Sequence, residues 1–329
     1  MKLYEIKYFL DEAIHSPVFD YIRHLVTVEE QLSVKQSWEN GYHLCLFGYL
    51  EEQRCAHITH QLEQIQKVHP SPIYDIEEFK QRYLKVAKLT QAESGLDTIF
   101  QNDVQVLEKN DFYSFENSEQ LHLYLLIHHT FDKHFAQNYF IENQILDIII
   151  QLYPFVQALP ETMLHKESGL QSNGYASHLS HYVGLINSLK EHDRDKVRAR
   201  FDAQIQEDLP LFEAQLNKDN PGLLKDLMNI YEVVGAYVDE GFINFFSPKN
   251  YETDIVPYLH LYNERHSMVF KNQETREKLL LDHVSCTNKW ILNVLYEKLV
   301  LLKIKPIEKF YMNYFYSSLK YDQAALEVR

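Results

Sequence analysis

Glycine and proline are scarce in this chain, with nine and ten copies among 329 residues. Because both residues interrupt helices and strands, their scarcity favours long regular elements. The signatures G-x-x-x-x-G-K-[ST] and G-x-G-x-x-G are absent, which excludes the two common phosphate-binding scaffolds that depend on them. The pattern G-x-S-x-G is also absent, so the chain carries no nucleophile motif of that kind.

Cysteine is rare, and its three copies match neither a C-x-x-C motif nor a disulfide framework. A reducing, cytoplasmic location is the simplest expectation. Cys45 and Cys286 come with no recognisable catalytic partner, so we expect buried structural thiols. No apolar run reaches the roughly 20 residues of a membrane span, and the start, MKLYEIKYFLDEAIHS, has no secretory cleavage pattern. A membrane partner is therefore not expected.

Positive charge is in deficit, because 32 Lys and Arg residues face 47 Asp and Glu residues, giving a formal net charge of −15. Binding to nucleic-acid backbones depends on clustered Lys and Arg, so direct nucleic-acid binding is not expected. Hydrophobic residues make up 45% of the chain and aromatic residues 13%, as in a packed globular protein. The length predicts one large or two moderate domains.

The N-terminal part of the sequence predicts a strand, a helix, a hairpin and a second helix. Alternating apolar residues indicate strands, and apolar residues three or four apart indicate helices. Asn40 and Gly41 supply the positive-φ turn that a tight hairpin needs. The segments are KLYEIKYFL, SPVFDYIRHLVTVEEQL, VKQSWENGYHLCLFGYL and EEQRCAHITHQLEQIQKV, with a closing strand near DVQVLEK. This order is typical of the beginning of a ferredoxin-like fold.

From Ser118 onward the pattern predicts long helices, beginning with SEQLHLYLLIHHTFDKHFAQNYFIENQILDIIIQLYPF. The later helical segments are GYASHLSHYVGLINSL, RDKVRARFDAQIQEDLPLFEAQL, PGLLKDLMNIYEVVGAYVDEGF and REKLLLDHVSCTNKWILNVLYEKLVLL. The polar stretch EKNDFYSFENSE is the expected boundary. The predicted fold class is α+β, with a small ferredoxin-like N-terminal sheet region over residues 1–112 and a larger, mostly helical domain over residues 113–329.

Seventeen histidines raise the question of a metal site. Three pairs have helical ligand spacing: His57 with His60, His178 with His181, and His128 with Asp132. A stable site usually needs a third protein ligand and oriented outer partners, and no H-E-x-x-H motif supplies them. We therefore expect no metal or other cofactor, with solvated or capping histidines as the ordinary interpretation.

The segment SNGYASHLSHYVG places a turn before a helix that opens with Ser177, His178 and His181. A helix N-terminus favours an anion such as a carboxylate, and a neighbouring histidine could exchange protons with it. Simple N-capping explains the same pattern, so both interpretations stay open.

Taken in order, these segments resemble the glutamate-elimination domain of class I lanthipeptide dehydratases and its stand-alone relatives, the thiopeptide-type bacteriocin biosynthesis proteins, which include pyridine-forming enzymes. Trp38, Gly41 and His43 match the family's Trp-x-x-Gly-x-His turn. LTQAESGLDTIFQNDVQ is similar to the segment that follows, SHLSHYVGLI to the family's Ser-His helix, and DHVSCTNKWILNVLYE to its C-terminal helix. The resemblance covers nearly the whole chain.

The resemblance implies that the protein acts on a ribosomally made precursor peptide that carries a leader. It assigns catalytic roles to His43, His178 and His283. The matching substrate-binding positions are Lys35, Trp38, Asn40, Ser177, His181, Asn288 and Lys289. A partner that glutamylates the peptide or uses aminoacyl-tRNA would act first, and the resemblance leaves a homodimer open.

The family's strand arginines, which would bind a glutamyl carboxylate, are replaced here by Gln36, Cys45 and Phe47. Lys35 and Lys289 could carry positive charge instead, but lysine does not reproduce the bidentate fork of arginine on a carboxylate. Two reactions stay open: elimination of glutamate from a glutamylated serine or threonine, and a pyridine-forming reaction between two dehydroalanines. The missing arginines favour the second reaction, or a reaction of another kind, over the first. A non-catalytic binding or scaffold subunit that keeps the fold is the alternative from a different class.

Overall fold

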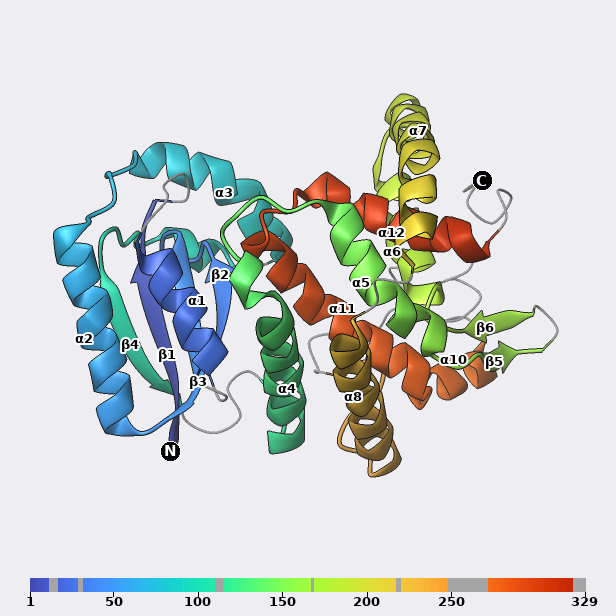
Figure 1. Cartoon of the computed structure of the whole chain (residues 1–329), viewed down its shortest axis with the longest axis horizontal. Helices are drawn as coiled ribbons and strands as arrows, with labels where there is room; N and C mark the ends of the chain where they lie inside the picture. The colour runs from blue at the N-terminus through green and yellow to red at the C-terminus, as the bar shows by residue number, and fades with distance from the viewer. Residues whose placement is uncertain are drawn as a thin grey trace. The chain divides into compact units, whose positions relative to one another are not determined.

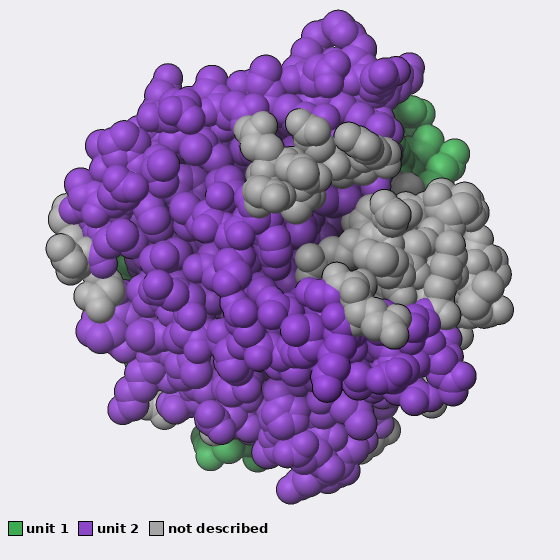
Figure 2. Space-filling model, turned by 90° about the vertical axis from the view of Figure 1, so that its right-hand side faces the viewer, with its two compact units in different colours: residues 1–113, 128–142, 300–303 green, residues 114–127, 143–299, 304–329 purple. Residues whose placement is uncertain are grey.

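The computed structural model describes residues 1–11, 17–28, 32–90, 92–109, 115–166, 169–216, 220–247 and 272–321. The chain divides into two compact units, shown in different colours in Figure 2. Unit 1 contains residues 1–113, 128–142 and 300–303, and unit 2 contains residues 114–127, 143–299 and 304–329. The α+β class expected from the sequence is confirmed, while the division at residue 112 stays a prediction.

The elements of the N-terminal part of unit 1 follow the predicted order (Figure 1). They are β1 (Lys2–Phe9), α1 (Val18–Val28), β2 (Leu32–Ser37), β3 (His43–Leu50), α2 (Glu52–Val68), α3 (Ile76–Thr90), a 3-10 turn (Glu93–Leu96) and β4 (Val104–Lys109). The four strands form one sheet in the order β2-β3-β1-β4, with every neighbouring pair antiparallel. This order and the two helical crossovers are those of a ferredoxin-like unit.

The two faces of the sheet differ because side chains alternate along each strand. One face is apolar, with Ile6, Val34 and Leu46 nearly or fully buried, and α1 and α2 pack against it (Figure 1). The opposite face carries Ser33 and Phe47, which contact a second helix, α4 (Ser118–Phe135). Both faces of this small sheet are therefore covered within unit 1.

Unit 2 is mostly helical. Besides residues 118–127 of α4 it contains α5 (Ile145–Ala158), β5 (Thr162–His165), β6 (Leu170–Ser172), α6 (Ala176–Ser188), α7 (Glu191–Gln215), α8 (Pro221–Asp239), α10 (Gln273–Leu280), α11 (His283–Leu301) and α12 (Pro306–Lys320). Helix α12 packs on α5, α6 and α7, where aromatic rings from the four helices fill the core. Trp290 of α11 is also buried in this unit, with its ring 6.0 Å from that of Phe115.

Two predicted helical segments are interrupted. The segment after Ser118 ends its first helix at Phe135, and Phe140 then adopts a left-handed φ of 66° before α5 begins. The C-terminal segment is divided into α10 and α11, because the Asp282 carboxylate accepts a hydrogen bond from the Ser285 amide (2.7 Å) and starts a new helix. The sequence pattern indicated helices in both segments but did not place these two breaks.

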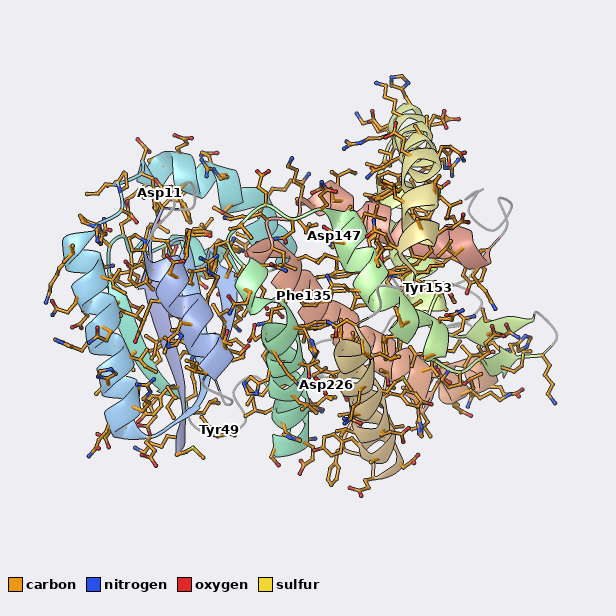
Figure 3. All side chains as sticks on the ribbon, viewed as in Figure 1. Asp11, Tyr49, Phe135, Asp147, Tyr153 and Asp226 are labelled. Atoms are coloured by element: carbon orange, nitrogen blue, oxygen red, sulfur yellow. The ribbon has the colours of Figure 1, made fainter. Side chains whose placement is uncertain are left out.

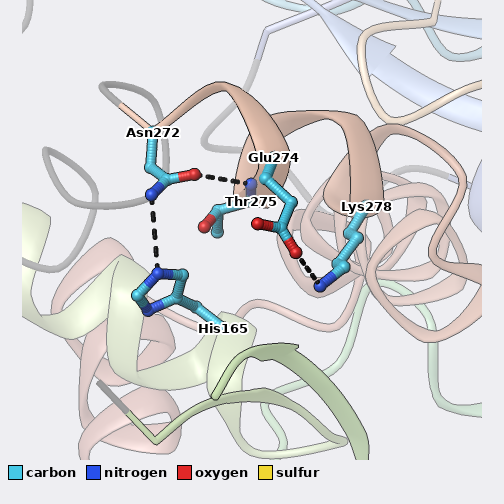
Figure 4. Close-up of polar contacts among 5 residues, drawn as sticks. All are labelled: His165, Asn272, Glu274, Thr275 and Lys278. Atoms are coloured by element: carbon cyan, nitrogen blue, oxygen red, sulfur yellow. Dashed lines mark hydrogen bonds and ion pairs between the residues drawn. The ribbon is translucent and has the colours of Figure 1, made fainter. Parts of the chain in front are cut away.

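The short hairpin β5–β6 packs against α10. Figure 4 shows how α10 begins there: the Asn272 side chain accepts from the Thr275 amide (3.0 Å), and its Nδ2 lies 3.4 Å from His165 Nε2. Within the same helix Lys278 pairs with Glu274 at 2.6 Å. No helix in the described ranges is both long enough and apolar enough to cross a membrane.

Candidate functional site

The turn between β2 and β3 is longer than a tight hairpin. Five residues link the strands, and Asn40 and Gly41 have φ values of 62° and 114°. The Asn40 amide donates to the Gly95 carbonyl (2.6 Å), and Asn40 Nδ2 donates to the Thr98 carbonyl (3.1 Å). The structure therefore uses Asn40 to fix the turn, while its substrate-binding role stays a prediction.

A row of polar side chains crosses the second face of the sheet. Lys35 of β2 and Lys7 of β1 are both register partners of Cys45 on β3, so the three side chains point to the same face. The Lys35 ammonium lies 5.0 Å from the centre of the Phe47 ring. Burial raises the pKa of the Cys45 thiol to about 12, so this cysteine is a poor nucleophile.

His43 is adjacent to this row, at the start of β3, and is 1% exposed. Its Nδ1 donates to the Gly41 carbonyl (2.8 Å), which leaves Nε2 as the unprotonated nitrogen of a neutral ring. Burial lowers the pKa of His43 to about 4, and the nearby Lys7 and Lys35 act in the same direction. At neutral pH this histidine is a hydrogen-bonding group without charge.

His178 of α6 is the centre of a buried cluster in unit 2. Asn313 of α12 donates from Nδ2 to the Lys309 carbonyl (3.1 Å), so its Oδ1 is the acceptor for its other partners. It accepts from His178 Nδ1 at 2.7 Å and from the Tyr296 hydroxyl at 3.1 Å. The His178 ring also contacts that of Tyr316, with centroids 4.5 Å apart. Burial lowers the pKa of His178 to about 4, so its ring is neutral with the proton on Nδ1.

Replacing Asn313 with leucine removes the acceptor shared by His178 and Tyr296. We expect a loss of about 2 kcal/mol in the free energy of unfolding, because buried donors are left unpaired. Urea denaturation measures this loss. The matched control is Asn187→Leu, at a half-buried position of α6. Equal stability of the two variants would contradict the role assigned to Asn313.

His283 is the first residue of α11 and is paired with a carboxylate. Its Nε2 lies 2.9 Å from Asp239 Oδ1, at the end of α8. The carboxylate accepts the Nε2 proton, and Nδ1 faces Gly235. A Cβ at position 235 would lie 3.0 Å from this Nδ1, so the absence of a side chain there makes room for the ring. A histidine oriented by a carboxylate is an arrangement that can transfer protons.

The neighbouring predicted residues on α11 are engaged with backbone. Asn288 donates from Nδ2 to the Asn173 carbonyl (3.0 Å), and Lys289 donates to the carbonyls of Phe245 (2.6 Å) and Ser247 (3.0 Å). Burial lowers the pKa of Lys289 to about 8, so a fraction of this amine is neutral near pH 7.5. Lys289 is thus a weaker point charge than a surface lysine.

The remaining predicted residues lie beside the His178 cluster or in the hairpin turn. Ser177 is half-buried on α6, and His181 packs edge-on against Tyr296 with centroids 5.1 Å apart. The α6 terminus has no side-chain cap, and the amide of its N-cap residue Tyr175 donates instead to Asn173 Oδ1 (3.0 Å). Trp38 stacks on Tyr83 of α3 at 5.5 Å and 10°.

The predicted residues divide between the units, with His43, Lys35, Trp38 and Asn40 in unit 1 and the others in unit 2. Within unit 2, His178 and His283 have different partners and form two separate centres. Sequence reasoning missed three residues: Lys7 beside Cys45 in unit 1, and Asp239 and Asn313, which organise the two centres of unit 2. Strand alternation could have placed Lys7 beside Cys45, but no local spacing links Asp239 or Asn313 to the histidines they bind.

A metal centre is not assembled by the described part of the chain, since it contains no group of three His, Cys, Asp or Glu side chains close enough to share an ion. His178 instead donates to Asn313, and Asp132 accepts from Ser33 and from the Tyr139 hydroxyl. These side chains are engaged in protein hydrogen bonds.

No protein-family model and no curated protein matches the chain. Solved structures do match. A pyridine synthase, TbtD, from thiomuracin biosynthesis aligns with a TM-score of 0.66 over 97% of this chain and 97% of its own, at 13% sequence identity. TsrL aligns with a TM-score of 0.56 over 99% of this chain and 97% of its own, at 12% identity. The chain therefore shares the fold of these two structures along almost its whole length.

Proposed function

We propose that this protein matures a ribosomally synthesised peptide by a reaction of the pyridine-forming kind on a dehydrated precursor. The observation that carries the proposal is the similarity of fold to a thiomuracin pyridine synthase over 97% of both chains. In such a reaction two dehydroalanines are held close together. Their positioning accounts for much of the rate acceleration, and a few hydrogen bonds account for the rest. The partner is a leader-bearing precursor peptide, and an enzyme that glutamylates it or uses aminoacyl-tRNA acts earlier.

The sheet favours this reaction over glutamate elimination. Where family members carry arginines, Cys45 and Phe47 are 1% and 2% exposed and Gln36 is half-buried. None of the three offers a guanidinium fork to a glutamyl carboxylate. Lys7 and Lys35 supply positive charge on this face, but an ammonium does not reproduce the bidentate fork of a guanidinium on a carboxylate.

The proton-transfer roles fall on the two centres of unit 2. We assign His283 as the acid-base group, because Asp239 orients its ring and a third of the His283 side chain is exposed. His178 is a buried neutral ring held by Asn313, and its unprotonated Nε2 is suited to accepting a hydrogen bond from a substrate N–H or O–H. In unit 1, we assign His43 and Lys35 to peptide binding.

One observation favours the non-catalytic alternative. His43 and His178 are only 1% and 2% exposed, as expected for histidines that support a binding fold. A scaffold subunit would bind the precursor without changing its mass.

Mass spectrometry of the dehydrated precursor, incubated with and without the protein, tests the proposal. We expect a mass change with the wild type and a loss of about 100-fold in rate for Asp239→Asn, because the orienting carboxylate is removed. Gly235→Ala should slow the reaction as well, since its Cβ crowds His283 Nδ1. Glu232→Gln, exposed on the same helix α8, is the control. An unchanged precursor mass with tight binding would support the scaffold, and an unchanged mass without binding would refute both functions.

A further inference from the structure

A ladder of aromatic rings runs along α3 in unit 1. Trp38 stacks on Tyr83 with centroids 5.5 Å apart, and Tyr83 contacts Phe79 at 4.7 Å. Phe79 in turn stacks on Tyr74 at 5.0 Å with an interplanar angle of 24°. The turn residue Trp38 is therefore connected through ring contacts to Tyr74, just before α3 begins.

The end of this ladder opens into a pocket of about 190 Å³ within unit 1. Its lining consists of aromatic rings and charged side chains: Asp11, Tyr42, Tyr74, Asp75, Glu78, Phe79 and Arg82. Asp11, labelled in Figure 3, follows the end of β1, whereas most of the other residues come from α3 or the turn before it. Three carboxylates face one guanidinium, so the lining has an excess of negative charge.

Two of the acidic side chains of the lining belong to the start of α3. Asp75 Oδ1 accepts from the Glu78 amide (2.9 Å) and caps α3, which fixes the position of that carboxylate. Glu78 pairs with Arg82 at 3.4 Å, and both side chains are more than half exposed. An exposed pair of this kind is weak and is readily exchanged for another partner. The Tyr74 hydroxyl donates to the Phe100 carbonyl at 3.4 Å, which holds one ring of the wall.

We propose that this pocket binds an arginine side chain of the peptide substrate, with the guanidinium lying against the Tyr74–Phe79 wall and paired with the acidic side chains. Carboxylates accept the forked N–H donors of a guanidinium, and aromatic faces attract its planar charge. A lysine ammonium has no plane to stack on a ring and is more strongly hydrated, so it is the poorer fit. That the bound peptide is a substrate rests on the proposed function, but binding of the arginine side chain does not require turnover.

The test uses full-length protein and the peptides acetyl-Gly-Gly-X-Gly-Gly-amide, where X is arginine, lysine or citrulline. Binding is followed by calorimetry and by the fluorescence of Trp38 on its ladder. We expect saturable binding of the arginine peptide, about tenfold weaker binding of the neutral citrulline peptide, and weakening by added salt. Equal affinity for arginine and citrulline, or no saturation by the arginine peptide, overturns the proposal.

Paired variants locate the binding. Glu78→Gln should weaken the arginine peptide about fivefold, and Arg82→Gln should strengthen it about twofold, because it removes a like charge. Glu77→Gln, next to Glu78 but absent from the pocket lining, should leave affinity unchanged. Equal effects of the variants at positions 77 and 78 would mean that the peptide is held by the general negative charge of the chain, and would overturn the assignment. If a variant unfolds, the arginine and citrulline comparison on the wild type decides alone. Binding without a mass change of the precursor refutes the proposed reaction but not this pocket.

Discussion

Replacing Gly174 with alanine is expected to lower the free energy of unfolding by at least about 3 kcal/mol. Gly174 lies in the turn just before α6, and a Cβ there would lie 1.9 Å from the Val156 carbonyl oxygen of α5. The atoms nearest to this Cβ all belong to the backbone of Val156, which cannot turn aside as a flexible side chain would. The backbone of the turn or of α5 must therefore move. The movement displaces the start of α6, and with it the hydrogen bond between His178 and Asn313.

Gly184 in α6 provides the control. A Cβ at this position meets nothing within 4 Å, and the residue is exposed. Because alanine is the better helix former, Gly184→Ala should raise the free energy of unfolding by roughly 0.5–1 kcal/mol. Chemical denaturation of both variants measures the contrast. If Gly174→Ala is as stable as the wild type, the close approach of the turn to α5 is wrong.

Acidification is the second change with a large expected effect. His43 and His178 have folded-state pKa values of about 4 because burial penalises the charged ring, whereas an unfolded histidine titrates near 6.5. The unfolded chain therefore binds protons first as the pH falls below about 6.5. Stability is fully present above that pH and is lost progressively toward pH 4, by about 3 kcal/mol for each of the two histidines.

Urea denaturation at pH 7.5 and at pH 4.5 measures this loss. His178→Gln keeps a donor for Asn313 but cannot be protonated, so it should reduce the pH dependence by about 2.5 kcal/mol over this interval. His24→Gln is the control, because His24 is exposed on α1. A pH dependence that is unchanged by His178→Gln would show that the ring is charged or accessible in the folded state.

The sheet of unit 1 could be predicted because its information is local. Aromatic and branched residues identified β1, and the Asn40–Gly41 pair identified the turn between β2 and β3. The turn is nevertheless wider than expected, since Asn40 is bonded to residues 95–100, which are distant in sequence. Helix α3 and the hairpin β5–β6 were not predicted.

The helix breaks show a second limit. An apolar pattern continues across Asp282, but the capping of the Ser285 amide by its carboxylate ends one helix and begins another. The left-handed Phe140 is held by a hydrogen bond from its amide to the Leu301 carbonyl (2.7 Å), a contact between segments far apart in the chain. Neither break can be found from periodicity, because each depends on which side chain or carbonyl accepts a hydrogen bond from a particular backbone amide.

The candidate site was predictable only in part for the same reason. The histidines stood out by type and spacing, and resemblance to a family ordered them along the chain. Their pairing with Asp239 and Asn313 depends on the packing of α8 against the start of α11 and of α6 against α12. These are tertiary contacts between residues far apart in the sequence, so no short segment of the sequence predicts them.

The stacked Trp38 and the buried Trp290 are two intrinsic fluorophores. They are the two tryptophans of the chain, and one belongs to each unit. Trp38→Phe leaves a signal from unit 2, and Trp290→Phe leaves one from unit 1. Coincident denaturation curves from the two variants mean a single cooperative transition, whereas separated curves mean that each unit unfolds with a stability of its own.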